Sequence, residues 1–266
     1  MTTVFFLYFG HFALGLLATL FLVPERAGAK YFKLCSAIAA AMMTAAVYLV
    51  LRRYGLAGGA SAPGGALYSA LLGSAGASLV FCVLYNRAAH FGWKRLLAPL
   101  LGASLACGIA GVLLGTPAGQ RVLVAVTDLT SLLLLGAAAA AMILGHFYLV
   151  VIDLPIVALR RLTILLIVAL ALRAGVVAFA LLGPVAVGLE DARRVALGLW
   201  SPDGVFVWMR VLFGIAGPVS LLWFVWKTVE IRSTQSATGI LYVQLFLVMS
   251  GELLAKYLRV AAGLPL

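Results

Sequence analysis

The stretch SGELLAKYLRV, residues 250–260, lies within the last hydrophobic run of the chain, residues 238–263. A charged side chain inside hydrocarbon costs about 2.5–3.5 kcal/mol on insertion scales. Glu252, Lys256 and Arg259 stand at i, i+4 and i+7, which places all three on one face of a helix. This face therefore predicts polar partners on other helices of the same bundle.

The composition indicates a membrane protein. Of 266 residues, 65% are hydrophobic and 10% are charged, and the mean hydropathy is +1.16, well outside the range of soluble domains. Several apolar runs reach the roughly 20 residues that a helix needs to cross the bilayer. The strict alternation of apolar and polar residues that is typical of a β-barrel strand is not found in the sequence. The sequence therefore predicts an all-α integral membrane protein in which residues 1–266 form a single polytopic domain.

The apolar runs predict about eight transmembrane helices. These run over residues 3–23, 32–51, 66–85, 96–114, 121–151, 162–182, 205–229 and 238–263. The first run lacks the basic flank of a signal peptide, so we expect a retained helix. Residues 189–200 are too short and polar to span and predict a helix in the membrane interface. Gly214, Gly217 and Pro218 predict a kink or freed carbonyls in the seventh span.

The net charge of +11 is interpreted as a topology signal and not as a nucleic-acid surface, because Lys and Arg cluster between apolar runs. The loops after the odd-numbered spans hold Arg26, Lys30, Lys33, Arg87, Lys94, Arg95, Arg160, Arg161, Lys227 and Arg232. The loops after the even-numbered spans hold Arg52, Arg53, Arg121, Arg193 and Arg194. The positive-inside rule therefore predicts an inner-membrane protein with both termini on the outer side.

This orientation places several polar residues in one layer, about 9–15 Å below the outer surface. They are His11, Asp128, Arg173, Arg210, Glu252 and Lys256. One interpretation is buried ion pairs, such as Glu252 with Arg173 or Asp128 with Arg210, that hold helices together. The other is a site that handles a proton and a polar head group, because intramembrane ionisable residues are functional candidates.

Quinol oxidation needs such a layer: an apolar cleft, partners for two ring oxygens, and an acid–base residue that leads to water. In this hypothesis His11 and Glu252 bind the ring oxygens and Asp128 is a second proton acceptor. Arg173 and Arg210 keep the carboxylates charged. Further polar contacts come from Tyr8, Lys256 and Tyr257.

The segment GELLAK, residues 251–256, resembles the last helix of the membrane subunits of the polysulfide and dimethyl sulfoxide reductase family. Those subunits carry a G-E-x-x-x-R-like segment there, and Lys256 stands where arginine is usual. The resemblance implies about eight helices that exchange electrons between a quinone and an iron–sulfur partner, with Glu252 and Lys256 at the quinone site. It also implies membrane or periplasmic redox subunits as partners, beside lipid.

Haem b is a second possible cofactor, because two imidazoles at similar depth on neighbouring helices can ligate it. His90 and His146 both fall near the inner surface and form the candidate pair, whereas His11 lies in the outer half. The alternative is that these histidines cap helix ends or face lipid head groups.

Two other functional classes remain open. Gly214, Gly217 and Pro218 would fit the broken helix of a secondary transporter for an ion or small solute. A structural membrane subunit, which contacts other chains through its Ala- and Gly-rich helices, would need no site. No phosphate loop, H-E-x-x-H or G-x-S-x-G motif is present, so any enzymatic role is that of a quinol-oxidising subunit. The sequence favours a quinone-interacting membrane anchor of an electron-transfer complex.

Overall fold

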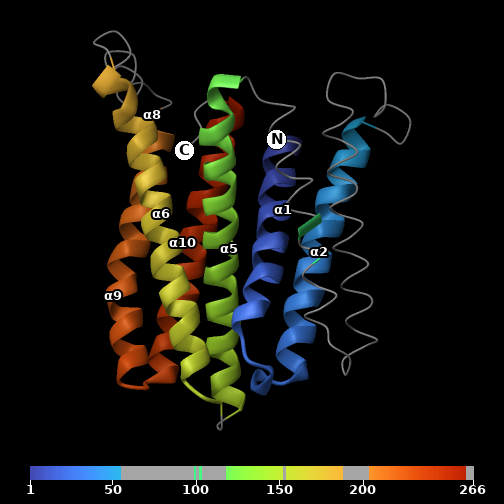
Figure 1. Ribbon diagram of the computed structural model, residues 1–266, viewed down its shortest axis with the longest axis vertical. Helices are drawn as coiled ribbons and strands as arrows, with labels where there is room; N and C mark the ends of the chain where they lie inside the picture. The colour runs from blue at the N-terminus through green and yellow to red at the C-terminus, as the bar shows by residue number, and fades with distance from the viewer. Residues whose placement is uncertain (55–98, 100–101, 104–117, 152–153, 188–203, 262–266) are drawn as a thin grey trace.

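The computed structural model describes residues 1–54, 99, 102–103, 118–151, 154–187 and 204–261 (Figure 1). Every regular element within these residues is helical. The long elements are α1 (Thr2–Thr19), α2 (Ala29–Tyr54), α5 (Arg121–Val150), α6 (Val157–Val187), α8 (Gly204–Val211), α9 (Gly217–Glu230) and α10 (Thr234–Ala261). The short elements are η1 (Leu20–Leu22), η2 (Glu25–Ala27), η3 (Ala118–Gln120) and η4 (Leu212–Ala216).

Six helices in the described part of the chain are long and apolar enough to cross a membrane, which makes this an all-α multi-pass membrane protein. One of the six, Gly204–Glu230, combines α8, η4 and α9. The spans predicted over residues 66–85 and 96–114, and the surface helix over 189–200, lie outside the described residues. The described residues therefore contain six of the eight transmembrane helices that the sequence predicts.

The helix boundaries differ from the prediction mainly in α6 and α10. Helix α6 covers Val157–Val187, beyond both ends of the predicted 162–182, and α10 begins at Thr234 instead of residue 238. Arg160 and Arg161 are exposed, and long basic side chains can reach the polar interface without ending a helix. A hydrophobic run thus marks the apolar core of a span and not its ends.

Helices α5 and α10 lie at the centre of the bundle (Figure 1). Helices α6 and α9 pack on one side of this pair, and α1 packs on the other side with α2 outside it. Much of α5 is buried, including the alanine run from Ala137 to Ala141. Small side chains allow neighbouring backbones to approach closely, which is the usual basis of helix packing in membranes.

The closest approach between α1 and α5 is at a pair of glycines. A Cβ atom added to Gly15 would overlap the carbonyl oxygen of Leu132, and one added to Gly136 would overlap the backbone of Gly15. Only glycine fits at both positions, because any side chain would separate the helices. This crossing sets the position of α1, which carries His11, against α5, which carries Asp128.

We expect Gly15→Ala to destabilise the bundle by about 1–3 kcal/mol, because the new methyl group overlaps backbone that cannot rotate away. The thermal unfolding midpoint in detergent measures this effect. Gly10→Ala is the matched control on the same helix, because a Cβ there meets nothing within 4 Å. Equal midpoints for the two variants would contradict the close crossing.

Candidate functional site

The site is built around Glu252 on α10, whose side chain is fully buried. Arg173 on α6 binds both carboxylate oxygens, with Nε 2.8 Å from Oε1 and Nη2 3.1 Å from Oε2. Arg210 on α8 donates from Nη2 to Oε1 at 2.8 Å. Lys256, one turn along α10, places Nζ 3.2 Å from Oε2. One carboxylate thus holds three cations from three helices.

Ser131 on α5 completes this arrangement. Its hydroxyl donates to Oε2 of Glu252 at 2.5 Å and accepts a hydrogen bond from Nζ of Lys256. The nearby Thr127 carbonyl oxygen accepts from Nη1 of Arg173 at 3.2 Å. Glu252 therefore receives five hydrogen bonds, which fill the roughly four lone-pair positions of a carboxylate.

A second ion pair lies nearer the end of the bundle where α5 begins and α10 ends. Arg259 on α10 donates from Nη1 to Asp128 on α5, and Nε2 of His11 on α1 lies 3.8 Å from the same carboxylate oxygen. The His11 and Asp128 side chains are 13% and 14% exposed, whereas Glu252 is 0% exposed. This second group is therefore closer to water than the first.

A π-helical turn and two glycines allow Arg210 to reach Glu252. The turn η4 directly follows α8, so the seventh predicted span is interrupted at the predicted place. A Cβ added to Gly214 would overlap Nη1 of Arg210, and one added to Gly251 would overlap the backbone of Gly214. The missing side chains leave the space that the guanidinium fills. Single π-turns inside helices are frequent at functional sites.

Several buried polar atoms near this layer have no hydrogen-bond partner. Among the described residues they include Nε and Nη1 of Arg210, Nδ1 of His11 and Oγ1 of Thr127. The amide of Gln244, two turns before Glu252 on α10, is also buried with neither its nitrogen nor its oxygen bonded. A buried polar group left unpaired costs about 1–3 kcal/mol, so each such group indicates a place for a further partner.

The structure brings together the six polar residues that the sequence placed in one layer. Arg173, Arg210 and Lys256 contact Glu252 directly, so the predicted Glu252–Arg173 pair is confirmed. The predicted pairing of Asp128 with Arg210 is wrong. Asp128 instead pairs with Arg259 and His11, because Arg210 faces the deeper carboxylate.

Tyr257 is half-buried and packs on Phe206 of α8, with ring centroids 5.2 Å apart. Tyr8 is buried on α1, one turn before His11. His146 faces the outside of α5, where its Nδ1 shares a hydrogen bond of 3.2 Å with the exposed Tyr242 hydroxyl. His90 lies outside the described residues. The predicted His90–His146 haem pair therefore stays a prediction.

Sequence reasoning missed Ser131, Thr127 and Gln244. Ser131 lies three residues after Asp128, so it shares a helix face with a residue that was already a candidate. In the sequence, Gly251 is recognisable only as the first residue of the GELLAK segment. Its contact with Gly214 could not be predicted, because it depends on how two helices meet. Uncharged polar residues carry a weaker sequence signal, because their burial in a membrane is less costly than that of a charge.

The fold and the site together define a multi-pass α-helical membrane protein with a network of charged side chains buried between its helices. No family model, curated protein or solved structure matches this chain.

We expect Glu252→Gln to lower the free energy of unfolding by about 3–5 kcal/mol, because it leaves three buried cations without their anion. Thermal unfolding in detergent checks this. Glu230→Gln is the matched control, since Glu230 is 52% exposed and forms a simple surface pair with Lys227. That control should change stability by less than about 1 kcal/mol. Similar unfolding midpoints for both variants would contradict a structural role for Glu252.

Proposed function

We propose that this protein is a quinone-interacting membrane subunit of an electron-transfer complex, with its quinone site in the layer around Glu252. The observation that carries the proposal is the pair of unpartnered donors, Nε and Nη1, on the fully buried side chain of Arg210. A ring oxygen would accept from such a donor without exposing it to water. The resemblance of residues 251–256 to the polysulfide and dimethyl sulfoxide reductase family supports the same function.

In this proposal Glu252 and Arg210 have different roles. Glu252 already receives five hydrogen bonds, so it has no free position for a ring oxygen. Its role in this proposal is to hold Arg173, Arg210 and Lys256 in place. Arg210 uses Nη2 for Glu252, and its Nη1 is packed beside Gly214 and Gly251, so Nε is the donor left for a ligand.

An aromatic pair stands beside these donors. Phe206 lies one turn before Arg210 on α8, and Tyr257 directly follows Lys256 on α10. Their tilted rings are half-buried and offer an apolar wall for a planar head group. The Tyr257 hydroxyl adds a possible second partner for a ring oxygen.

His11 and Asp128 are better placed than Glu252 to move a proton. They are partly exposed and lie nearer the end of the bundle where α5 begins and α10 ends. A quinol supplies two electrons and two protons when it is oxidised. The electrons would pass one after the other to a redox centre of a partner subunit. Asp128 would accept the two protons in turn, and His11, whose Nε2 lies 3.8 Å from the Asp128 carboxylate, would pass each one on towards water. Arg259 keeps the Asp128 side chain oriented.

The proposed topology has eight spans in the inner membrane with both termini outside. Helix α2 ends and α5 begins at the same end of the bundle, which suits two further spans between them (Figure 1). Helix α1 begins and α10 ends at that end as well, together with the buried charges. Exposed Arg160, Arg161, Lys227 and Arg232 lie at the opposite end, as the positive-inside rule requires of a cytoplasmic face.

A secondary transporter is the second candidate, and η4 is the observation that favours it. Irregular helical turns at substrate sites are common in transporters, and η4 lies next to the buried Arg210. Purification from native membranes distinguishes the two functions. Iron–sulfur or cytochrome subunits that co-purify support the electron-transfer function, whereas a homogeneous chain without partners contradicts it.

We expect Arg210→Lys to weaken binding of a fluorescent quinol analogue by about tenfold, because a hydrogen bond to a charged group contributes about 1.5–3 kcal/mol. Lysine keeps the charge but cannot bind Glu252 and a ligand with a planar fork. Fluorescence titration of the purified protein measures the affinity. Arg161→Lys, at an exposed position, is the matched control and should bind as the unmodified protein does. Unchanged binding in a folded Arg210→Lys variant would contradict the site.

We expect Asp128→Asn to slow quinol-dependent electron transfer by about a hundredfold or more, because the amide cannot accept the proton. Binding of the quinol analogue should be unchanged, since Asp128 does not contact the ring in this proposal. Turnover in native membranes measures the rate. A variant that binds and turns over normally would exclude Asp128 from the proton path.

A further inference from the structure

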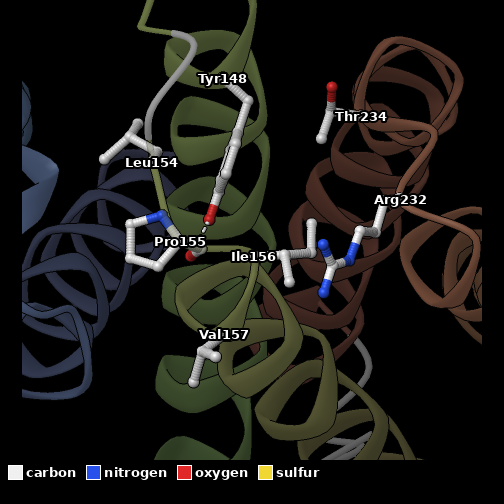
Figure 2. A pocket seen from close by; sticks show the side chains of 7 residues that line it. All are labelled: Tyr148, Leu154, Pro155, Ile156, Val157, Arg232 and Thr234. Atoms are coloured by element: carbon white, nitrogen blue, oxygen red, sulfur yellow. Dashed lines mark hydrogen bonds between the residues drawn. The ribbon is translucent and has the colours of Figure 1, made fainter.

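A pocket of about 480 Å³ lies at the end of the bundle opposite the buried charges. It opens between the α5–α6 connection and the turn that joins α9 to α10, and Figure 2 shows the side chains around it. Residues 154–157 form an apolar wall, and Arg232 and Thr234 line the other side. The pocket therefore combines one cation and a hydroxyl with hydrocarbon.

The α9–α10 turn positions Arg232 beside this wall. Its backbone is left-handed, with φ at 57°, and its N–H donates to the Val229 carbonyl oxygen at 3.2 Å. The Ser233 N–H donates to the Thr228 carbonyl oxygen at 2.9 Å, which closes the end of α9. Figure 2 shows the guanidinium of Arg232 reaching towards Ile156. The side chain lies across the pocket and not along the helix.

Tyr148 fixes the opposite wall. Its hydroxyl donates to the Pro155 carbonyl oxygen at 2.6 Å and so ties the α5–α6 connection to α5 (Figure 2). This bond uses the only proton of the phenol. Of the described residues that line the pocket, Arg232 is therefore the side chain that donates into it, because Figure 2 shows the Thr234 hydroxyl pointing away from the Arg232 guanidinium. A guanidinium suits an anion with several oxygen atoms.

The surroundings place the pocket at the level of lipid head groups. Arg160 stands over the Trp226 ring and Lys227 over the Trp223 ring, each 5.4 Å from the centroid. Tryptophan and basic residues of this kind mark the boundary between hydrocarbon and head groups. Glu230 is engaged by Lys227 at 2.9 Å.

We propose that this pocket binds a phosphate group, supplied by the head group of an anionic phospholipid. Arg232 holds the phosphate oxygens, and residues 154–157 cover the glycerol and the first acyl carbons. Basic pockets between helices on the cytoplasmic side of a membrane recognise such head groups. The inference does not depend on the quinone site, which lies at the other end of the bundle.

The test uses the full chain in detergent, titrated with phosphatidylglycerol, phosphatidylcholine or inorganic phosphate while thermal unfolding and retained lipid are followed. Phosphatidylglycerol should raise the unfolding midpoint more than phosphatidylcholine does. Arg232→Asn should weaken the phosphatidylglycerol effect about tenfold, since it removes a charge-assisted hydrogen bond to the phosphate. Asparagine tolerates the left-handed backbone, so the turn is retained.

Arg161→Asn is the matched control, because it removes the same charge at the same end of the bundle from an exposed residue outside the pocket. It should respond to phosphatidylglycerol as the unmodified protein does. If inorganic phosphate also raises the unfolding midpoint, and Arg232→Asn abolishes this rise, the pocket recognises phosphate but takes it from solution and not from a lipid. Equal effects of the two lipids, or equal losses in both variants, would overturn the proposal.

Discussion

A carboxylate buried within a membrane-spanning bundle must be paired, and the pairing of Glu252 organises the half of the bundle in which α5 begins and α10 ends. Moving an ion out of water costs several kcal/mol, which only close, well-directed partners offset. Here the partners come from α5, α6, α8 and α10 itself. Their contacts fix both the rotation and the depth of four helices. The contacts that form the candidate site therefore also hold the helices together.

The close helix crossings follow from this requirement. Arg210 reaches the carboxylate only because Gly214 and Gly251 leave room for its guanidinium. Gly15 and Gly136 provide the equivalent close approach between α1 and α5, which brings His11 to Asp128. Below this layer the alanine run of α5 is buried, and the Tyr31 hydroxyl on α2 donates to the Ala140 carbonyl oxygen at 3.4 Å. The glycines thus allow the close helix approach that brings the charged side chains together, and the ion pairs then stabilise the packed helices.

The residues of this network differ in how completely their hydrogen-bonding atoms are paired. Glu252 is saturated by its donors, whereas Arg210 retains two buried nitrogens without partners and His11 retains one. Each unpaired buried group is unfavourable by about 1–3 kcal/mol. The same region of the bundle holds the Phe206–Tyr257 ring pair and the partly exposed carboxylate of Asp128.

The sequence by itself determined that this is an all-α membrane protein and which charged residues share one layer. Both follow from hydropathy and helical rise, which are local properties. The sequence could not predict which charged residues pair with each other. Asp128 pairs with Arg259 and not with Arg210, and Ser131 binds Glu252 although no sequence pattern indicated it. Partner choice depends on the azimuth of each helix and on the backbone approach at Gly214 and Gly251. The pocket around Arg232 likewise joins two turns about 80 residues apart, so only the tertiary structure decided it.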